Sequence, residues 1–311
     1  MMKSGYLPIF LIVITAALNA QQSVQYRYLA SWGEPGTEAG QMREPGGMSI
    51  DPWGFIYIAD TGNHRIQKLD SHGIFITEIG GFGWESGQFD HPLNLYAGNG
   101  LDVMVADYNN DRIQRFDKDL NYLSSYRSSE DDPEQLQFAL PLDLDLSSQG
   151  ELYCLDGFNR RILKFDTQGR PQISFGDFDA GKGRLNSPRH MLIFNSQRIF
   201  ISDMHPARIV VFDIHGNYLN SFGEKQLMDP QDLCTIGKTQ IAVADAGLQD
   251  VLWFDVETGE LLTVLSKMQS GLIKLNEPVS VVSYKKRLYV LDKKSALIHL
   301  YERLLISGSA H

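Results

Sequence analysis

The chain has 311 residues, of which 43% are hydrophobic and 21% charged, so a predominantly disordered protein is excluded and a large core can form. The formal net charge of −10 disfavours a surface that follows phosphate backbones, although a local basic patch is compatible with it. The two cysteines, Cys154 and Cys234, lie 80 residues apart inside apolar runs, where buried free thiols are expected rather than a disulfide or a metal pair.

Residues 1–20 have the pattern of a secretory signal peptide. A short start that contains Lys3 is followed by the apolar run YLPIFLIVITAAL and then by small residues. An uncleaved anchor is the alternative, but this run of about thirteen residues is shorter than the roughly 20 that a membrane-spanning helix needs. We therefore expect cleavage after Ala20, export to the periplasm or the extracellular space, and no transmembrane segment in the mature chain.

From residue 42 onward one pattern recurs six times. Each copy has an apolar residue three positions before a proline, then a short apolar run that ends in aspartate, then a second run such as RIQKLD. The first runs read IYIAD, VMVAD, LYCLD, IFISD, IAVAD and LYVLD, and they end at Asp60, Asp107, Asp156, Asp203, Asp245 and Asp292. Their spacings of 47, 49, 47, 42 and 47 residues, with about four short strands per copy, are typical of propeller blades and not of a helical solenoid.

The sequence therefore predicts an all-β protein, a six-bladed β-propeller of four-stranded blades. We expect the blades near residues 44–80, 91–126, 140–176, 187–223, 229–265 and 277–302. In the fourth copy the strands are expected at residues 189–194, 198–203, 208–213 and 218–223.

The two ends of the chain are expected to meet in the last blade. The sixth copy stops after its third strand, and the segment YRYLASWG at residues 26–33 resembles the missing fourth strand. An N-terminal strand that completes the sixth blade closes the ring and pairs backbone groups that an open edge leaves exposed. The propeller then spans residues 21–304, and residues 305–311 form a short tail.

The repeated pattern resembles the NHL repeat, most clearly in the copy EPGGMSIDPWGFIYIADTGNHRIQKLDSHGIFITEIG. The resemblance covers almost the whole chain after residue 20. The fifth and sixth copies depart from it, with Asp250 and Leu297 where the other copies have arginine. The resemblance implies an exported, bacterial-type NHL propeller of six blades, and we expect it to be a monomer.

The repeated aspartate is expected to have a structural role. Asp60 can accept hydrogen bonds from backbone amides of the loop at residues 61–64 and can face Arg65 across the hairpin. Asp245 and Asp292 remain in the copies that lack the arginine, which favours loop capping over the ion pair as the general explanation. None of these aspartates is predicted to be catalytic.

The positions two residues after each proline are expected to form a ring at the mouth of the central channel. They are occupied by Gly47, Asn94, Asp143, His190, Asp232 and Ser280. Oxygen ligands from Asn94, Asp143 and Asp232 suit calcium, whereas His190 with the two aspartates gives the three-ligand set of an open zinc site. The alternative is that small polar residues serve turn geometry at these positions and bind no metal.

Two groups of six-bladed enzymes use such a channel. The amidating lyase, which this protein resembles through the NHL repeat, holds zinc with three histidines, whereas here only His190 occupies the ring, with His91 and Arg189 beside it. Gluconolactonase-type enzymes hold calcium with a Glu, Asn and Asp set, which Asn94, Asp143 and Asp232 can imitate. His190, Asp143 and Asp232 are therefore the candidate catalytic residues of a metal-dependent hydrolase or lyase.

The loops before each first strand and between each second and third strand are expected to form one rim, the usual binding face of a propeller. The candidate binding residues on this rim are Phe82, Trp84, His64, His91, Tyr108, Arg189 and His205. Aromatic side chains in surface loops are suitable anchors for a peptide or a sugar. The sequence thus favours a non-catalytic recognition scaffold for a protein, peptide or glycan over a channel enzyme, and the dispersed basic residues disfavour nucleic acid.

Overall fold

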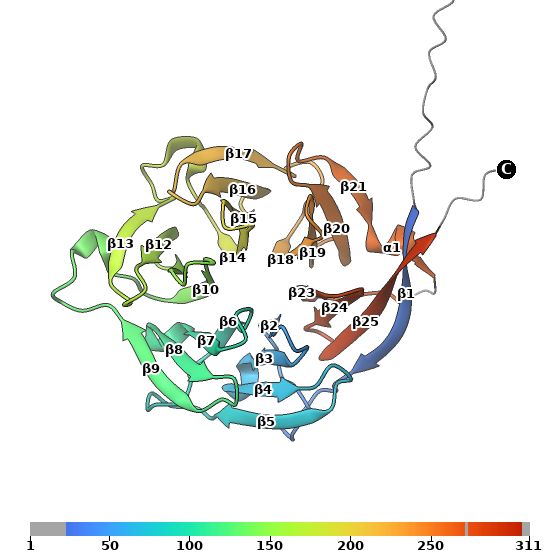
Figure 1. The fold of residues 1–311 in the computed structure, drawn as a ribbon, viewed down its shortest axis with the longest axis horizontal. Helices are drawn as coiled ribbons and strands as arrows, with labels where there is room; N and C mark the ends of the chain where they lie inside the picture. The colour runs from blue at the N-terminus through green and yellow to red at the C-terminus, as the bar shows by residue number, and fades with distance from the viewer. Residues whose placement is uncertain (1–22, 271–272, 307–311) are drawn as a thin grey trace, which may run out of the picture.

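The computed structural model describes residues 23–270 and 273–306, which form a ring of six β-sheets around a central channel (Figure 1). The predicted all-β, six-bladed propeller is confirmed. The leader predicted at residues 1–20 and most of the predicted tail lie outside the described residues. Within the described ranges, no helix combines the length and the apolar character that crossing a bilayer requires.

Five of the blades contain four antiparallel strands, arranged outward in chain order. Blade one consists of β2 (Gly47–Ile50), β3 (Ile56–Asp60), β4 (Arg65–Leu69) and β5 (Phe75–Gly80). Blade two consists of β6 (Pro92–Tyr96), β7 (Asp102–Asp107), β8 (Arg112–Asp117) and β9 (Tyr122–Arg127). Blade three consists of β10 (Pro141–Leu146), β11 (Leu152–Asp156), β12 (Arg161–Phe165) and β13 (Pro171–Phe175).

Blade four consists of β14 (Pro188–Phe194), β15 (Arg198–Met204), β16 (Ala207–Asp213) and β17 (Tyr218–Phe222). Each of these strands begins and ends within one residue of its expected position. Blade five consists of β18 (Pro230–Ile236), β19 (Gln240–Asp245), β20 (Asp250–Asp255) and β21 (Leu261–Val264). The short helices are η1 (Thr61–Asn63), η2 (Tyr108–Asn110), η3 (Glu134–Leu136), η4 (Gly181–Gly183) and α1 (Leu265–Met268).

Blade six joins the two ends of the chain. It contains β23 (Pro278–Tyr284), β24 (Arg287–Asp292), β25 (Leu297–Ile306) and β1 (Ser23–Trp32). Strand β1 runs antiparallel to β25 and pairs Tyr28 with Tyr301 and Trp32 with Ile298, so the predicted closure by the N-terminal strand is confirmed. A two-residue strand, β22 (Gln269–Ser270), pairs in parallel with the outer edge of β1. The sequence does not predict this fifth strand, which covers an edge that would otherwise expose unpaired backbone groups.

The blades pack face to face, and their central strands are buried on both sides. All five residues of β3 are buried, whereas β5 at the outside of the same blade alternates between half-buried and exposed residues. This difference explains why the runs that end in aspartate are continuously apolar, because a strand covered on both faces has no solvent side.

The repeated aspartates are fully buried, and their hydrogen bonds differ from the expectation. Asp60 accepts the backbone amide of Arg43 at 2.7 Å through Oδ1, and its Oδ2 accepts Arg65 Nε at 2.7 Å and Asn63 Nδ2 at 2.9 Å. No backbone amide of residues 61–64, all of which are described, donates to this carboxylate. The prediction of amide capping within that loop is therefore wrong for blade one.

The bond that all six copies share runs to the loop that precedes the first strand. The donors are the amides of Arg43, Asp90, Ala139, Asn186, Met228 and Asn276. In blades three, five and six the expected loop amides donate as well, from Asn159, Leu248 and Ser295. The aspartate thus fixes the rim loop that enters each blade, a contact 16 or 17 residues apart in sequence that local pattern does not reveal.

Candidate functional site

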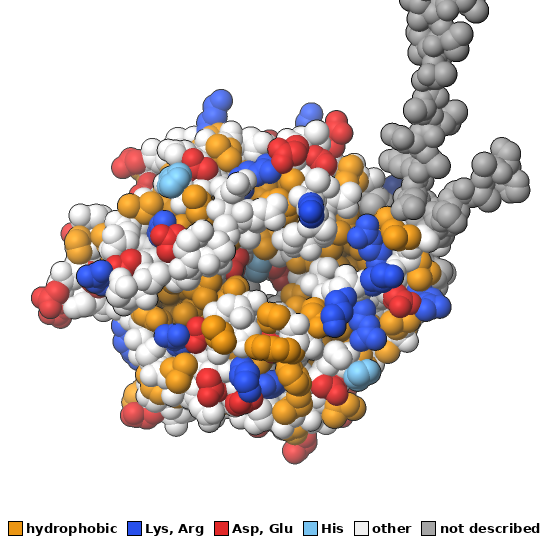
Figure 2. All heavy atoms as spheres, viewed as in Figure 1, with side chains coloured by type: hydrophobic (Ala, Val, Ile, Leu, Met, Phe, Trp, Pro, Cys, Tyr) orange, Lys and Arg blue, Asp and Glu red, His pale blue; other side chains and the backbone are white. Residues whose placement is uncertain are grey.

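The first strands of the six blades line the channel, and two cavities follow its axis. The cavity nearer the rim has a volume of about 150 Å³, and the one nearer the opposite face has a volume of about 210 Å³. His190 and Asp232 line both. Figure 2 shows one face of the ring hollowed at its centre, with histidine and acidic side chains at the bottom of the hollow.

The ring of positions predicted from the prolines lies where the two cavities adjoin, since His190 and Asp232 line both, Asn94 lines the one nearer the rim and Asp143 lines the other. We call Asn94, Asp143, His190, Asp232 and Ser280 the collar. A β-bulge lies between the proline and the collar residue in blades three, four, five and six. Bulges bend a strand and change the direction of a side chain, which explains how a position two residues after the proline comes to face the channel.

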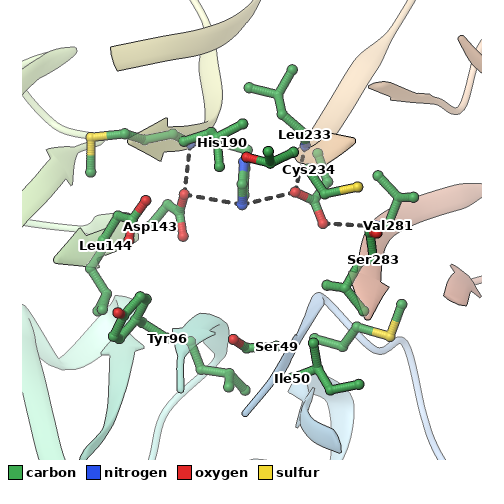
Figure 3. Close-up of a pocket in the computed structure, with 18 residues that line it drawn as sticks. Ser49, Ile50, Tyr96, Asp143, Leu144, His190, Leu233, Cys234, Val281 and Ser283 are labelled. Atoms are coloured by element: carbon green, nitrogen blue, oxygen red, sulfur yellow. Dashed lines mark hydrogen bonds and ion pairs between the residues drawn. The ribbon is translucent and has the colours of Figure 1, made fainter. Parts of the chain in front are cut away.

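His190 lies between two carboxylates that belong to the neighbouring blades (Figure 3). Its Nε2 is 2.8 Å from Asp232 Oδ1 and 3.4 Å from Asp143 Oδ2. Its Nδ1 is buried and has no hydrogen-bond partner among the described residues. The predicted association of these three residues is therefore observed, with the histidine from β14 and the aspartates from β10 and β18.

The collar carboxylates also join successive blades. Asp143 Oδ2 accepts the Met191 amide at 2.7 Å, and Asp232 Oδ2 accepts the Val281 amide at 2.9 Å. Deeper in the channel, Asp145 Oδ2 accepts the Ile193 amide at 2.7 Å in the same manner. In each case the acceptor lies in one first strand and the donor in the first strand of the next blade. These aspartates therefore have a structural role, the linking of neighbouring blades, that the sequence pattern does not predict.

Burial and mutual charge shift the pKa values of the channel groups. Burial raises the pKa of Asp143 to about 6 and that of Asp145 to about 7. Burial lowers the pKa of His190, but the carboxylates of Asp143 and Asp232 outweigh this effect and raise it to about 9. At neutral pH His190 is therefore an imidazolium that donates its Nε2–H to Asp232.

The collar does not fit the calcium or zinc ion predicted from Asn94, Asp143, His190 and Asp232. Asn94 Oδ1 accepts the amide of Leu95 at 2.9 Å and occupies space that a Cβ at position 47 would fill. His190, Asp143 and Asp232 also do not bring one ligand atom each within 4.8 Å of one another. Among the described residues the group that does so is His64, Asp90 and His91.

The predicted rim residues lie on the loops that surround the smaller cavity. Phe82 and Trp84 are 65% and 69% exposed, although the Phe82 ring also packs edge-on against His64 with 5.2 Å between centroids. The remaining predicted rim residues are placed as follows: His64 and Tyr108 are half-buried, and His91, Arg189 and His205 are exposed. The rim residues are thus distributed around the ring, except where His64 contacts both Phe82 and His91 and the Tyr108 amide donates to the His91 carbonyl at 3.3 Å.

Sequence reasoning missed three further apolar side chains on the rim. Phe158, Phe178 and Met228 are 67%, 74% and 64% exposed. Phe158 follows β11 in the loop between the second and third strands, and the other two lie in loops that lead into first strands. Aligning all the rim loops by the repeat, rather than only the longest ones, would have found them.

Basic side chains gather over blade six, at the right of Figure 2. Lys285, Lys286 and Arg287 lie at the turn between β23 and β24, and the Arg303 amide donates to the Lys286 carbonyl at 2.7 Å. Lys293 and Lys294 follow β24 on the rim instead. The absence of nucleic-acid binding stays a prediction.

The family model described as NHL repeat matches residues 42–69, the first of the six blades that share this pattern. The chain is an NHL-repeat β-propeller. It is 26% identical over 196 residues to Protein brain tumor of Drosophila melanogaster, which is 63% of this chain and 14% of that protein. It is 23% identical over 170 residues to NHL repeat-containing protein 3 of Homo sapiens, which is 54% of this chain and 43% of that protein. The chain thus spans less than half the length of either relative.

Solved structures with the same architecture include streptogramin B lyase. This NHL-repeat propeller superposes on it with a TM-score of 0.61 and 12% identity, covering 90% of this chain and 98% of the lyase. A catalytically inactive virginiamycin B lyase from Staphylococcus aureus with quinupristin gives a TM-score of 0.62 at 12% identity, covering 90% and 99%. At this identity the similarity establishes the fold and not the activity.

Proposed function

We propose that this NHL-repeat propeller is an exported, non-catalytic recognition scaffold that binds a protein, peptide or glycan on its loop rim. One observation carries the proposal: large apolar side chains are exposed on rim loops of successive blades, at Phe82, Trp84, Phe158, Phe178 and Met228. The channel carboxylates, in contrast, already accept backbone amides of neighbouring blades. The rim therefore offers apolar surface for contact with a ligand, whereas the polar groups of the channel are largely occupied by the fold.

Trp84 is the strongest candidate anchor because its side chain is exposed while its loop is held. Arg112 Nη1 donates to the Trp84 carbonyl at 2.7 Å, and Arg112 Nη2 donates to the carbonyls of Glu85 and Gln88. Covering the exposed part of an aromatic side chain of about 200 Å² at ~25 cal/mol per Å² contributes on the order of 3 kcal/mol. A loop that is already ordered loses little entropy when a ligand binds.

The proposal includes export. The charged start, the apolar run and the small residues of residues 1–20 support cleavage after Ala20. N-terminal sequencing of the protein recovered from cells that express the full chain should begin at Gln21. Recovery of the intact N-terminus in the cytoplasmic fraction alone would remove this part of the proposal.

Binding to the rim is tested with peptide libraries and glycan arrays probed with the purified full chain. Ligands selected by the wild type should lose about tenfold or more in affinity with Trp84→Ala. Trp53→Ala is the matched control, because Trp53 is 58% exposed but lies in the turn between β2 and β3 on the opposite face. Equal losses in the two variants would contradict binding on the rim.

A hydrolase or lyase acting in the channel is the second candidate function. It is favoured by His190 and Asp145, whose pKa values of about 9 and about 7 lie near the range for proton exchange and which border the same cavity. The metal-dependent form has no support from the collar geometry. Streptogramin B, named by the structural neighbours, is the first substrate to assay, and turnover that His190→Gln abolishes would replace the scaffold proposal.

A further inference from the structure

The rim contains a place where each blade meets the next. At this junction, the last residue of the loop between the second and third strands of one blade lies beside a residue of the next blade. The latter is the residue directly before the proline at which the first strand of that blade begins. Between blades one and two these residues are His64 and His91, with φ angles of 55° and 56°, and the His91 amide donates to His64 Nδ1 at 3.2 Å. Between blades two and three they are Asp111 and Leu140, with φ angles of 50° and 52°, and the Leu140 amide donates to Asp111 Oδ1 at 2.7 Å.

The two junctions share the features that the fold requires and differ in their side chains. Both need residues that tolerate a left-handed conformation, which is uncommon outside glycine. Both also place a side-chain acceptor opposite the same backbone amide. The second junction meets these needs with one carboxylate and an aliphatic residue. The fold therefore does not require two imidazoles at the first junction.

A carboxylate completes the first junction. Asp90 Oδ1 is 3.6 Å from His64 Nδ1 and 3.5 Å from His91 Nδ1. One ligand atom from each of the three residues lies within 4.8 Å of the other two. In a tetrahedral zinc site with bonds of about 2.0–2.1 Å, two ligand atoms are roughly 3.4 Å apart. The observed separations thus require only small side-chain movements.

We propose that His64, Asp90 and His91 form a binding site for a zinc-class divalent ion that bridges blades one and two on the rim. Two imidazole nitrogens and one carboxylate oxygen are ligands that zinc accepts in proteins. Three protein ligands leave a fourth position for water or for a donor from a bound partner. The site is separate from the collar in the channel and goes beyond the proposed rim binding, which does not depend on it.

The surroundings of the three residues support a held but accessible site. Asn109 Nδ2 donates to Asp90 Oδ1 at 3.1 Å, and the Asp90 amide donates to Asp107 Oδ1 at 2.8 Å, so the carboxylate is oriented from outside. The side chains of His64, Asp90 and His91 are 22%, 27% and 47% exposed, which leaves a path for the ion.

Binding exchanges one interaction for another. The ion takes the lone pair of His64 Nδ1 that accepts the His91 amide, so this hydrogen bond is replaced by a metal–nitrogen bond. Ligation requires neutral imidazoles, and therefore binding weakens as the solution becomes acidic.

The test uses the untagged full chain after treatment with a chelator, titrated with ZnCl₂ by calorimetry and with CoCl₂ by visible absorption. We expect one ion per chain and the absorption of four-coordinate cobalt. His64→Asn keeps an acceptor for the His91 amide and tolerates the left-handed conformation, and His91→Leu copies the residue at the next junction. Each should weaken binding about 100-fold or more, and so should Asp90→Asn, whose shape is unchanged.

His205→Ala and His190→Gln are the matched controls, because one removes another rim histidine and the other removes the collar histidine. Both should bind zinc as the wild type does. Absence of stoichiometric binding in the wild type overturns the proposal, as does unchanged affinity in Asp90→Asn. Loss of binding in His190→Gln also overturns it, since the ion would then lie at the collar. If no peptide or glycan binds to the rim but zinc binding is observed, only the proposed function is contradicted.

Discussion

Closure of the ring by β1 can be tested with one substitution in that strand. Tyr26 is 2% exposed and packs on Trp253 of blade five, with ring centroids 5.3 Å apart. It also belongs to a core cluster that contains Leu288 and Tyr301 of blade six. Tyr26→Ala therefore removes an aromatic side chain from the place where the N-terminal strand, blade five and blade six meet.

The expected loss follows from burial. An aromatic side chain of about 200 Å² at ~25 cal/mol per Å² gives up to about 5 kcal/mol. Truncations of large core aromatics to alanine lower the free energy of unfolding by about 3–5 kcal/mol. Leu29 lies in the same strand but is 39% exposed, and Leu29→Ala should change the free energy by about 0.5 kcal/mol.

Urea denaturation followed by fluorescence and circular dichroism measures both variants against the wild type. If β1 holds the ring closed, Tyr26→Ala shifts the transition strongly and Leu29→Ala barely shifts it. Separate transitions for the two probes would indicate that blade six opens before the remaining blades. Equal and small shifts in the two variants would refute the role of β1 in closure.

Two further predictions concern buried charge. Arg112→Ala should lower the free energy of unfolding by about 3–5 kcal/mol in urea denaturation, because it leaves the buried carboxylate of Asp107 unpaired. Arg115 forms a partly exposed ion pair, so Arg115→Ala should lower this free energy by less than about 1 kcal/mol. Similar losses in the two variants would contradict the argument. Burial raises the pKa of Asp145 to about 7, so the folded chain retains a proton that the unfolded chain releases near pH 4, and this contribution to stability is lost as the pH rises through 7. Asp145→Asn should therefore flatten the decline of unfolding free energy between about pH 4 and pH 7, and an unchanged slope in urea titrations would contradict the assignment.

The architecture could be predicted because the sequence repeats one pattern at intervals typical of propeller blades. Six copies of one pattern define six blades, and the missing fourth strand of the last copy indicates that another segment must supply it. Strand β22 could not be predicted in this way, because it belongs to a connection outside the repeat and pairs through backbone groups with β1. Contacts that depend on a residue's place within the repeat were predictable, and contacts between irregular loops were not.

The candidate site was predictable to the same extent. Equivalent positions placed His190 beside Asp143 and Asp232, as the structure confirms. The pattern could not indicate that the two carboxylates accept amides from the next blade, because such a bond depends on the offset between adjacent first strands. Nor could it bring Asp90 to His64, since their contact arises at the junction of two loops 26 residues apart.

The repeat also shows how the rim and the channel are related. The ionisable groups of the channel, Asp143, His190 and Asp232, come from blades three, four and five. Phe158 and Phe178 lie on rim loops of blade three and its connection to blade four, and Met228 lies between blades four and five. Because blades follow one another around the ring, these apolar side chains and the charged part of the channel occupy the same half of it. Under the proposed function, a ligand held by these rim side chains would lie over the half of the channel that contains His190, so that a negatively charged or carbonyl group directed into the channel would meet the histidine of the collar.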